Sequence, residues 1–254
     1  MQTLASRLPD SKILLIYSLL VIAFANSFAV GFNKTIPQLA ICVISALAAD
    51  FVLKLFLTGK KVFSQSAIIS GLFIGMVFSP ETPFAFLVFA CAVAMLLKHF
   101  VRMNFLNVFN PAVSGMLVTL LVFPVVAEGW WGYGIPWLVV LLGLLVCLKA
   151  DRLYASLSFV LSYFILYLLL LVFSNGLALT QAAQSSFTFL PLFMGFLMLV
   201  DPMTSPPKKK PQIAYGFLAA LFSIALLVLH SSFFLYAGLL AANATRFELS
   251  KRLK

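Results

Sequence analysis

Charged residues are scarce in this sequence: they make up only 9% of its 254 residues, and seventeen lysines and arginines outnumber seven acids. A soluble domain carries roughly a quarter charged residues and about half apolar ones, whereas 63% of this chain is hydrophobic. Apolar runs recur from residue 13 to residue 246. The composition therefore predicts an all-α, polytopic membrane protein and leaves no room for a soluble catalytic domain.

Motifs for catalysis and metal binding are also missing. There is no glycine-rich nucleotide loop, no nucleophile with a neighbouring base and no paired carboxylates. The three cysteines, Cys42, Cys91 and Cys147, lie singly in apolar runs, so we interpret them as buried residues and not as metal ligands. We expect no catalytic side chain and no metal site, and any reaction must rely on a cofactor.

Ten candidate membrane segments result when the apolar runs are divided at proline, glycine and charged breaks. A helix needs about 20 residues to cross a bilayer core of about 30 Å, so ten segments leave only short loops. The first segment is longer than the apolar core of a signal peptide, about 7 to 15 residues, and is interpreted as a retained span. The segments are 13–31, 36–57, 67–79, 83–100, 105–123, 135–149, 153–174, 187–200, 212–229 and 231–246.

The positions of lysine and arginine support this topology. With a cytoplasmic N-terminus, sixteen of the seventeen fall on the cytoplasmic side and only Lys34 falls outside, as the positive-inside rule requires. Both termini are therefore predicted to be cytoplasmic, and the basic charge is interpreted as inner-leaflet anchoring, including at Lys208–Lys210, and not as a nucleic-acid surface. The sixteen are Arg7, Lys12, Lys54, Lys60, Lys61, Lys98, Arg102, Lys149, Arg152, Lys208, Lys209, Lys210, Arg246, Lys251, Arg252 and Lys254.

Segments three and eight are too short for a simple span, and each ends in a related tetrapeptide. These are Ser79-Pro80-Glu81-Thr82 and Asp201-Pro202-Met203-Thr204, 122 residues apart, with Gly75 and Gly195 just upstream. An odd number of spans separates them, which predicts two inverted five-helix repeats, residues 1–124 and 125–254, with broken third helices. Broken helices expose backbone groups that a ligand can satisfy. A helix-ending turn that arose twice is the alternative explanation.

A few polar residues inside the apolar segments are candidates for function. Asp201, followed by Thr204 and Ser205, is the acid that we most expect to matter. Asn110 is predicted to cap a helix in which Pro111 occupies the first turn, and the small residues after it favour close approach of another helix or of a flat ligand.

Other polar and aromatic residues have ordinary explanations. Asp50 lies four residues before Lys54, which favours an interfacial ion pair over a proton relay. His99 and His230 are expected at headgroup level. Trp130, Trp131, Tyr133 and Trp137 are expected to form an outer aromatic belt, while Asn243 needs a partner on a neighbouring helix or in the site.

Three stretches together resemble one family. They are Ser70-Gly71-Leu72-Phe73-Ile74-Gly75 through Ser79-Pro80, then Phe109-Asn110-Pro111-Ala112, then Leu199-Val200-Asp201-Pro202-Met203-Thr204-Ser205-Pro206 followed by Tyr215-Gly216. The family comprises the RnfD-type membrane protein of the Rnf electron-transport complex and the NqrB-type membrane protein of the sodium-pumping NADH:quinone oxidoreductase. The resemblance covers roughly residues 60 to 250.

The resemblance implies a ten-helix bundle of two inverted repeats in a prokaryotic cytoplasmic membrane, related in fold to urea and ammonium-type channels. It implies a non-covalent flavin, riboflavin or FMN, that passes electrons across the membrane within a multi-subunit, ion-coupled complex. The cofactor-binding residues it suggests are Gly75, Ser79, Pro80, Thr82, Asn110, Pro111, Gly195, Asp201, Pro202, Thr204 and Ser205.

This sequence departs from the family at one point, because it contains no S/T-G-A-T motif for covalent FMN. A compact variant is therefore expected, which relies on a separate flavinylated or quinone partner. The alternative function is a channel or transporter for a small solute on the same scaffold.

Overall fold

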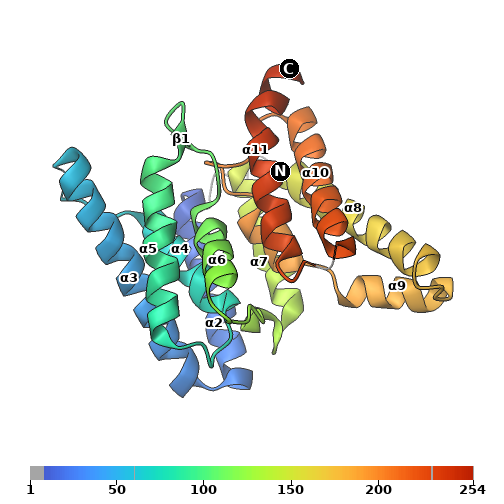
Figure 1. Ribbon diagram of the computed structural model, residues 1–254, viewed down its shortest axis with the longest axis horizontal. Helices are drawn as coiled ribbons and strands as arrows, with labels where there is room; N and C mark the ends of the chain where they lie inside the picture. The colour runs from blue at the N-terminus through green and yellow to red at the C-terminus, as the bar shows by residue number, and fades with distance from the viewer. Residues whose placement is uncertain (1–8, 60, 230, 254) are drawn as a thin grey trace. The chain divides into compact units, whose positions relative to one another are not determined.

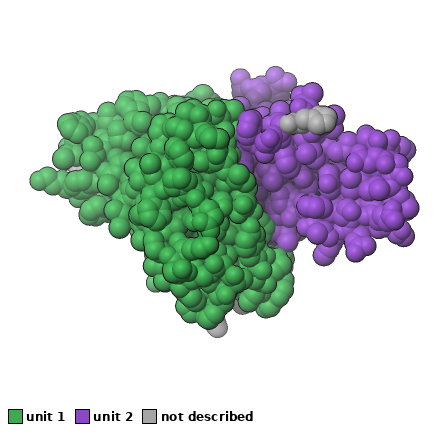
Figure 2. Space-filling model, turned by 60° about the horizontal axis from the view of Figure 1, so that its bottom comes forward, with its two compact units in different colours: residues 1–149 green, residues 150–254 purple. Residues whose placement is uncertain are grey.

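The computed structural model describes residues 9–59, 61–229 and 231–253, and these residues are mostly helical (Figure 1). Arg7, Lys60, His230 and Lys254, which the sequence interpretation used, lie outside the described residues. The chain divides into two compact units, Met1–Lys149 and Ala150–Lys254, which Figure 2 colours separately. The sequence predicts the repeat boundary between residues 124 and 125, so unit 1 contains one predicted segment more than the first repeat.

Unit 1 is built around a short buried helix. α4 (Gln65–Val77) packs against α2 (Ser11–Val30) and α3 (Phe32–Thr58), and α5 (Phe84–Phe100) packs between α3 and α6 (Pro111–Val122). Nine of the thirteen α4 residues are buried, as expected for a helix that is apolar on all sides. α7 (Pro136–Ala150) follows a single 3-10 turn, η1 (Trp130–Gly132). The third segment is thus a short helix that its neighbours enclose.

The fifth segment begins later than the predicted residue 105. The chain first forms a two-stranded antiparallel hairpin, β1 (Arg102–Met103) and β2 (Leu106–Asn107), whose turn places Asn104 and Phe105 at positive φ. α6 starts only at Pro111, where the Asn110 side chain accepts a hydrogen bond from the Val113 backbone N–H at 3.3 Å. The predicted start of the segment is wrong, but the predicted cap is confirmed.

Unit 2 contains the second broken segment. α10 (Lys209–Val228) packs against both α8 (Leu153–Phe173) and α11 (Phe234–Arg252), and α9 (Leu179–Thr188) contacts α8 (Figure 1). The eighth segment, predicted as 187–200, is not one helix. Its first two residues are the last residues of the polar helix α9. Helical structure resumes after Pro191 and includes one π-helical turn, η2 (Met194–Met198).

The described helices are those of a multi-pass membrane protein. α2, α3, α8 and α10 are long and apolar enough to cross a bilayer, and α4, α5, α6 and α7 are shorter apolar helices. Large apolar side chains such as Phe56 and Phe173 are more than 80% exposed, which suits a lipid environment and not water. Ten spans and an inverted repeat stay predictions.

Candidate functional site

The two predicted tetrapeptides form the same local turn. In each, the backbone N–H of the last residue donates to the carbonyl oxygen of the first at 3.0 Å, from Thr82 to Ser79 and from Thr204 to Asp201. In each, the side chain of the first residue accepts a hydrogen bond from the backbone N–H of the third, at 3.4 Å for Ser79 and 3.0 Å for Asp201. Sequence similarity at these positions therefore corresponds to the same pattern of hydrogen bonds.

In unit 1 the turn follows the C-terminal end of α4, where carbonyl groups lack helical partners. Gln38 on α3 donates through Nε2 to the carbonyl oxygens of Gly75 at 2.8 Å and Phe78 at 3.1 Å. The indole N–H of Trp130 donates to the same Gly75 oxygen at 2.7 Å. The other amide atom of Gln38, Oε1, is buried and has no hydrogen-bond partner. An acceptor therefore remains open beside the end of the broken helix.

In unit 2 two arginines contact the turn. Arg152 donates through Nε to the Ser205 hydroxyl at 2.9 Å, and Arg246 donates to the Met203 carbonyl oxygen. Both are at most 8% exposed. Burial lowers the pKa of Arg152 below its usual value, and the nearby carboxylates of Asp151 and Asp201 oppose that shift. The two guanidinium groups therefore place positive charge beside the Asp201 turn.

A second glutamine in unit 2 resembles Gln38 in its bonding. Gln212 on α10 donates through Nε2 to the carbonyl oxygens of Asp151 at 2.7 Å and Pro207 at 3.1 Å, and its buried Oε1 has no partner. Both glutamines directly follow a proline inside a helix, Pro37 in α3 and Pro211 in α10. Each unit thus holds a glutamine that donates to two backbone carbonyl oxygens and keeps a buried acceptor open.

The remaining predicted residues are separated within unit 1. Ser79 donates its backbone N–H to Val126, just beyond the C-terminal end of α6, whereas Asn110 caps the N-terminal end of that helix. Twelve residues at about 1.5 Å each put these ends roughly 18 Å apart. Asn110 and Pro111 therefore begin α6, whereas the Ser79–Thr82 turn contacts the chain that follows the end of this helix.

The predicted glycines are packed against neighbouring helices. A Cβ atom on Gly75 would lie 3.0 Å from the Leu39 side chain of α3, and one on Gly195 would lie 2.9 Å from the Phe159 ring of α8. A Cβ on Gly115 would collide with the Ala90 carbonyl oxygen of α5. Close helix packing accounts for the small residues at these positions.

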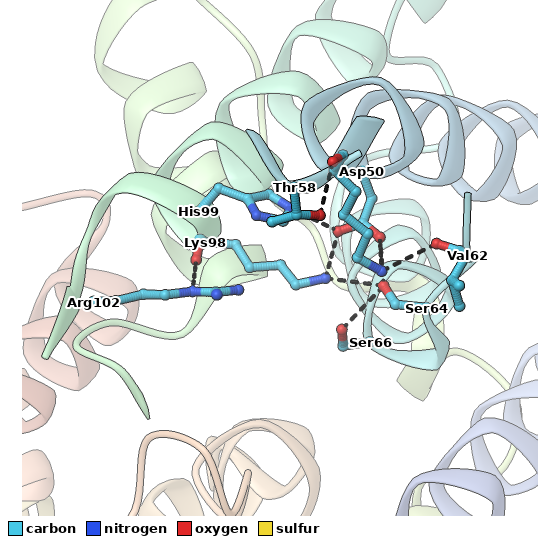
Figure 3. A network of polar contacts seen from close by, with 9 residues as sticks. Asp50, Thr58, Val62, Ser64, Ser66, Lys98, His99 and Arg102 are labelled. Atoms are coloured by element: carbon cyan, nitrogen blue, oxygen red, sulfur yellow. Dashed lines mark hydrogen bonds and ion pairs between the residues drawn. The ribbon is translucent and has the colours of Figure 1, made fainter. Parts of the chain in front are cut away.

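Asp50 forms a larger buried network than its predicted ion pair (Figure 3). The expected Lys54 pair is present at 2.8 Å, but the carboxylate also contacts Lys98 at 2.7 Å and His99 Nε2 at 3.0 Å, and accepts a hydrogen bond from the Ser64 hydroxyl at 2.6 Å. The Asp50 side chain is 1% exposed and that of His99 only 7%. The headgroup depth predicted for His99 stays a prediction, but its side chain is enclosed by the protein. The network joins α3 and α5 to the segment that precedes α4.

Two other interpretations are resolved by partners on neighbouring helices. Trp130 is fully buried, so it does not belong to an aromatic belt, whereas Tyr133 and Trp137 are 55% and 63% exposed, as such a belt requires. Asn243 donates to the Tyr215 hydroxyl at 2.5 Å, which identifies α10 as the source of a partner.

Sequence reasoning missed Gln38, Gln212, Arg152 and Arg246 as parts of the two turns. A signal was available for the glutamines, because an uncharged polar residue after proline in an apolar segment is itself costly in lipid. The arginines were counted only as topology markers. Among the described residues, no group of histidine, cysteine or acidic side chains could hold a metal ion.

Comparison with known sequences adds one finding. The model of the NQR2, RnfD, RnfE family matches residues 5–135. The matched range includes Gly75, the Ser79–Thr82 turn and Asn110, and the Asp201 turn lies beyond it. No curated protein sequence matches the chain.

Proposed function

The chain belongs to the NQR2, RnfD, RnfE family, whose model matches more than half of it, and on this premise we propose that it transfers electrons across the membrane. Family membership and the apolar helices make it a membrane subunit of an Rnf- or Nqr-like complex. The finer proposal is that it binds riboflavin or FMN non-covalently. The observation that carries it is the pair of equivalent turns, together with a buried amide acceptor without a partner in each unit, on Gln38 and on Gln212.

The polar groups present fit a flavin. The ring system of a flavin has a polar edge on which an N–H donor lies between two carbonyl acceptors. The open Oε1 atoms of Gln38 and Gln212 can accept from such a donor. Arg152 and Arg246 supply positive charge beside the Asp201 turn, where it would favour the negative charge that a flavin gains on reduction.

The candidate contacts are those predicted from the sequence, taken separately for each unit. In unit 2 they are Asp201, Pro202, Thr204 and Ser205, with Gly195 as a packing residue. In unit 1 they are Ser79, Pro80 and Thr82 after Gly75, and, at the other end of α6, Asn110 with Pro111. When bound, the flavin supplies the redox chemistry, and these residues bind it, orient it and exclude water.

Other membrane subunits of the complex are the partners that family membership suggests. A separate flavinylated or quinone partner would supply or accept the electrons, because these 254 residues contain no S/T-G-A-T motif. Coupling of this electron flow to ion movement forms part of the proposal.

The test is the flavin content of the full chain purified in mild detergent. We expect the visible absorbance of oxidised flavin, and we expect Asp201→Asn to lower the flavin-to-protein ratio severalfold. Glu248→Gln is the matched control, because Glu248 is an acid of the same unit that is 54% exposed and pairs with Arg252, away from the Asp201 turn, so its loss should leave the ratio unchanged. A chain without flavin that conducts a solute in liposomes would support the channel alternative instead.

A further inference from the structure

A groove lies on unit 2 between the N-terminal halves of α8 and α10, and none of the turn residues described above lines it. Its volume is about 470 Å³, and it is shallow and largely open. Its wall is mainly apolar and includes Ile213, Ala214 and Phe217 of α10, together with Leu253 after α11. Ile213 and Phe217 are 49% and 44% exposed. Apolar surface of this kind on a membrane-spanning helix faces lipid tails.

The groove has one charged lining residue, Lys210, near the start of α10. Lys210 lines the groove, as do Ser158 and Ser162 of α8. The Ser158 hydroxyl donates to the Ile213 carbonyl oxygen at 2.7 Å, which joins the two helices at this depth. Lys210 and Phe217 are seven residues apart, or about 10 Å along the helix. The groove therefore runs from a cationic end into the apolar part of the span.

More cations surround the open end. Lys208 and Lys209 precede Lys210 and are exposed, and the Lys209 ammonium lies 5.2 Å from the centre of the Tyr154 ring. The end of α11 adds Lys251, while Arg252 is paired with Glu248. Positive charge exceeds negative charge here, so the groove end attracts an anion at the depth of the lipid headgroups.

We propose that this groove binds one anionic phospholipid, with its phosphate at Lys210 and one acyl chain along the Ile213–Phe217 wall. The headgroup supplies the selectivity, because an acyl chain gains little by leaving other lipid tails for an apolar protein surface. Free phosphate would leave the apolar wall unused. This site is independent of flavin binding and of electron transfer.

Native mass spectrometry of the full chain, released from nanodiscs of equal phosphatidylglycerol and phosphatidylcholine, tests the proposal. We expect one phosphatidylglycerol to be retained in preference to phosphatidylcholine. Each lysine near an anionic headgroup contributes roughly fivefold, so Lys209→Gln with Lys210→Gln should weaken this preference by about twenty-five-fold. Lys61→Gln, an exposed cytoplasmic-side lysine of unit 1, removes the same kind of charge elsewhere and should leave the preference intact.

A second variant separates the groove from the charge. Ala214→Trp fills the wall while keeping every lysine, and should abolish retention of the single lipid without changing the elution profile of the protein. Equal retention of both lipids, an equal effect of Lys61→Gln, full competition by inorganic phosphate, or retention unaffected by Ala214→Trp would each overturn the proposal. Loss of the lipid when partner subunits are present would show that a subunit occupies the groove, and would overturn it as well.

Discussion

The substitution Asp50→Asn should destabilise unit 1 far more than loss of an exposed ion pair. The Lys98 side chain is only 6% exposed and its ammonium lies 2.7 Å from Asp50, so the variant leaves a buried cation without its carboxylate. Lys54 is 21% exposed and can turn toward water, which limits the cost to one stranded charge. Removing one member of a buried pair costs about 3 to 5 kcal/mol.

That free energy converts into a measurable melting shift. At roughly 2 to 4 °C per kcal/mol for a chain of this size, the midpoint should fall by about 10 °C. Thermal unfolding in detergent can be followed with a thiol-reactive dye, because Cys42 and Cys91 are completely buried in the same unit. Their labelling reports the opening of unit 1.

Two controls decide whether stranded charge is the cause. Asp50→Asn combined with Lys98→Met removes both charges and should recover most of the lost stability. Glu81→Gln breaks the Lys34–Glu81 pair, whose side chains are 47% and 74% exposed, and should cost at most about 1 kcal/mol. The reasoning is refuted if Asp50→Asn shifts the midpoint no further than Glu81→Gln, or if the double variant is no more stable than Asp50→Asn.

Three further predictions concern unit 1. Asn110→Ala removes the α6 cap and should cost about 1 kcal/mol, whereas Asn110→Asp should keep most of it; equal melting points for wild type and Asn110→Ala would contradict the cap. Gly115→Leu forces α5 and α6 apart at Ala90 and should destabilise by about 1 to 3 kcal/mol or more, measured by the same thiol labelling. Gln38→Leu leaves the Phe78 carbonyl oxygen unpaired and should lower the free energy of unfolding by about 1 to 3 kcal/mol. As Gln38 is a proposed flavin contact, the same variant should also bind less flavin. A variant with wild-type stability and flavin content would remove Gln38 from the proposed site.

Much of the helical layout was predictable because each apolar run stands out against a chain with few charges. The boundaries of α3, α5, α7 and α8 lie within a few residues of the predicted segments, and the Asn110 cap follows from residue chemistry alone. The β1–β2 hairpin was not predicted, because Leu106 and its apolar neighbours continue the run that precedes α6. The polar helix α9 was missed because its residues lack the apolar pattern of a span.

The candidate site was predicted in part. The Ser79 and Asp201 tetrapeptides were recognised as equivalent, and they form equivalent turns. The residues that complete them come from other helices: Gln38 lies 37 residues before Gly75, and Arg152 lies 53 residues before Ser205. No local pattern joins residues so far apart in the chain.

By itself, the sequence determined a multi-pass membrane protein, its short third segment, and its resemblance to the family to which it belongs, because hydrophobicity and short motifs are local properties. Only the tertiary structure decided which polar groups meet. In the structure, Asp50 is buried among Lys54, Lys98 and His99, and Trp130 lies at the end of α4 and not in the predicted aromatic belt. Gln38 and Gln212 each keep an acceptor without a partner. The physical reason is that a polar group in an apolar segment needs a partner, and packing between helices selects that partner.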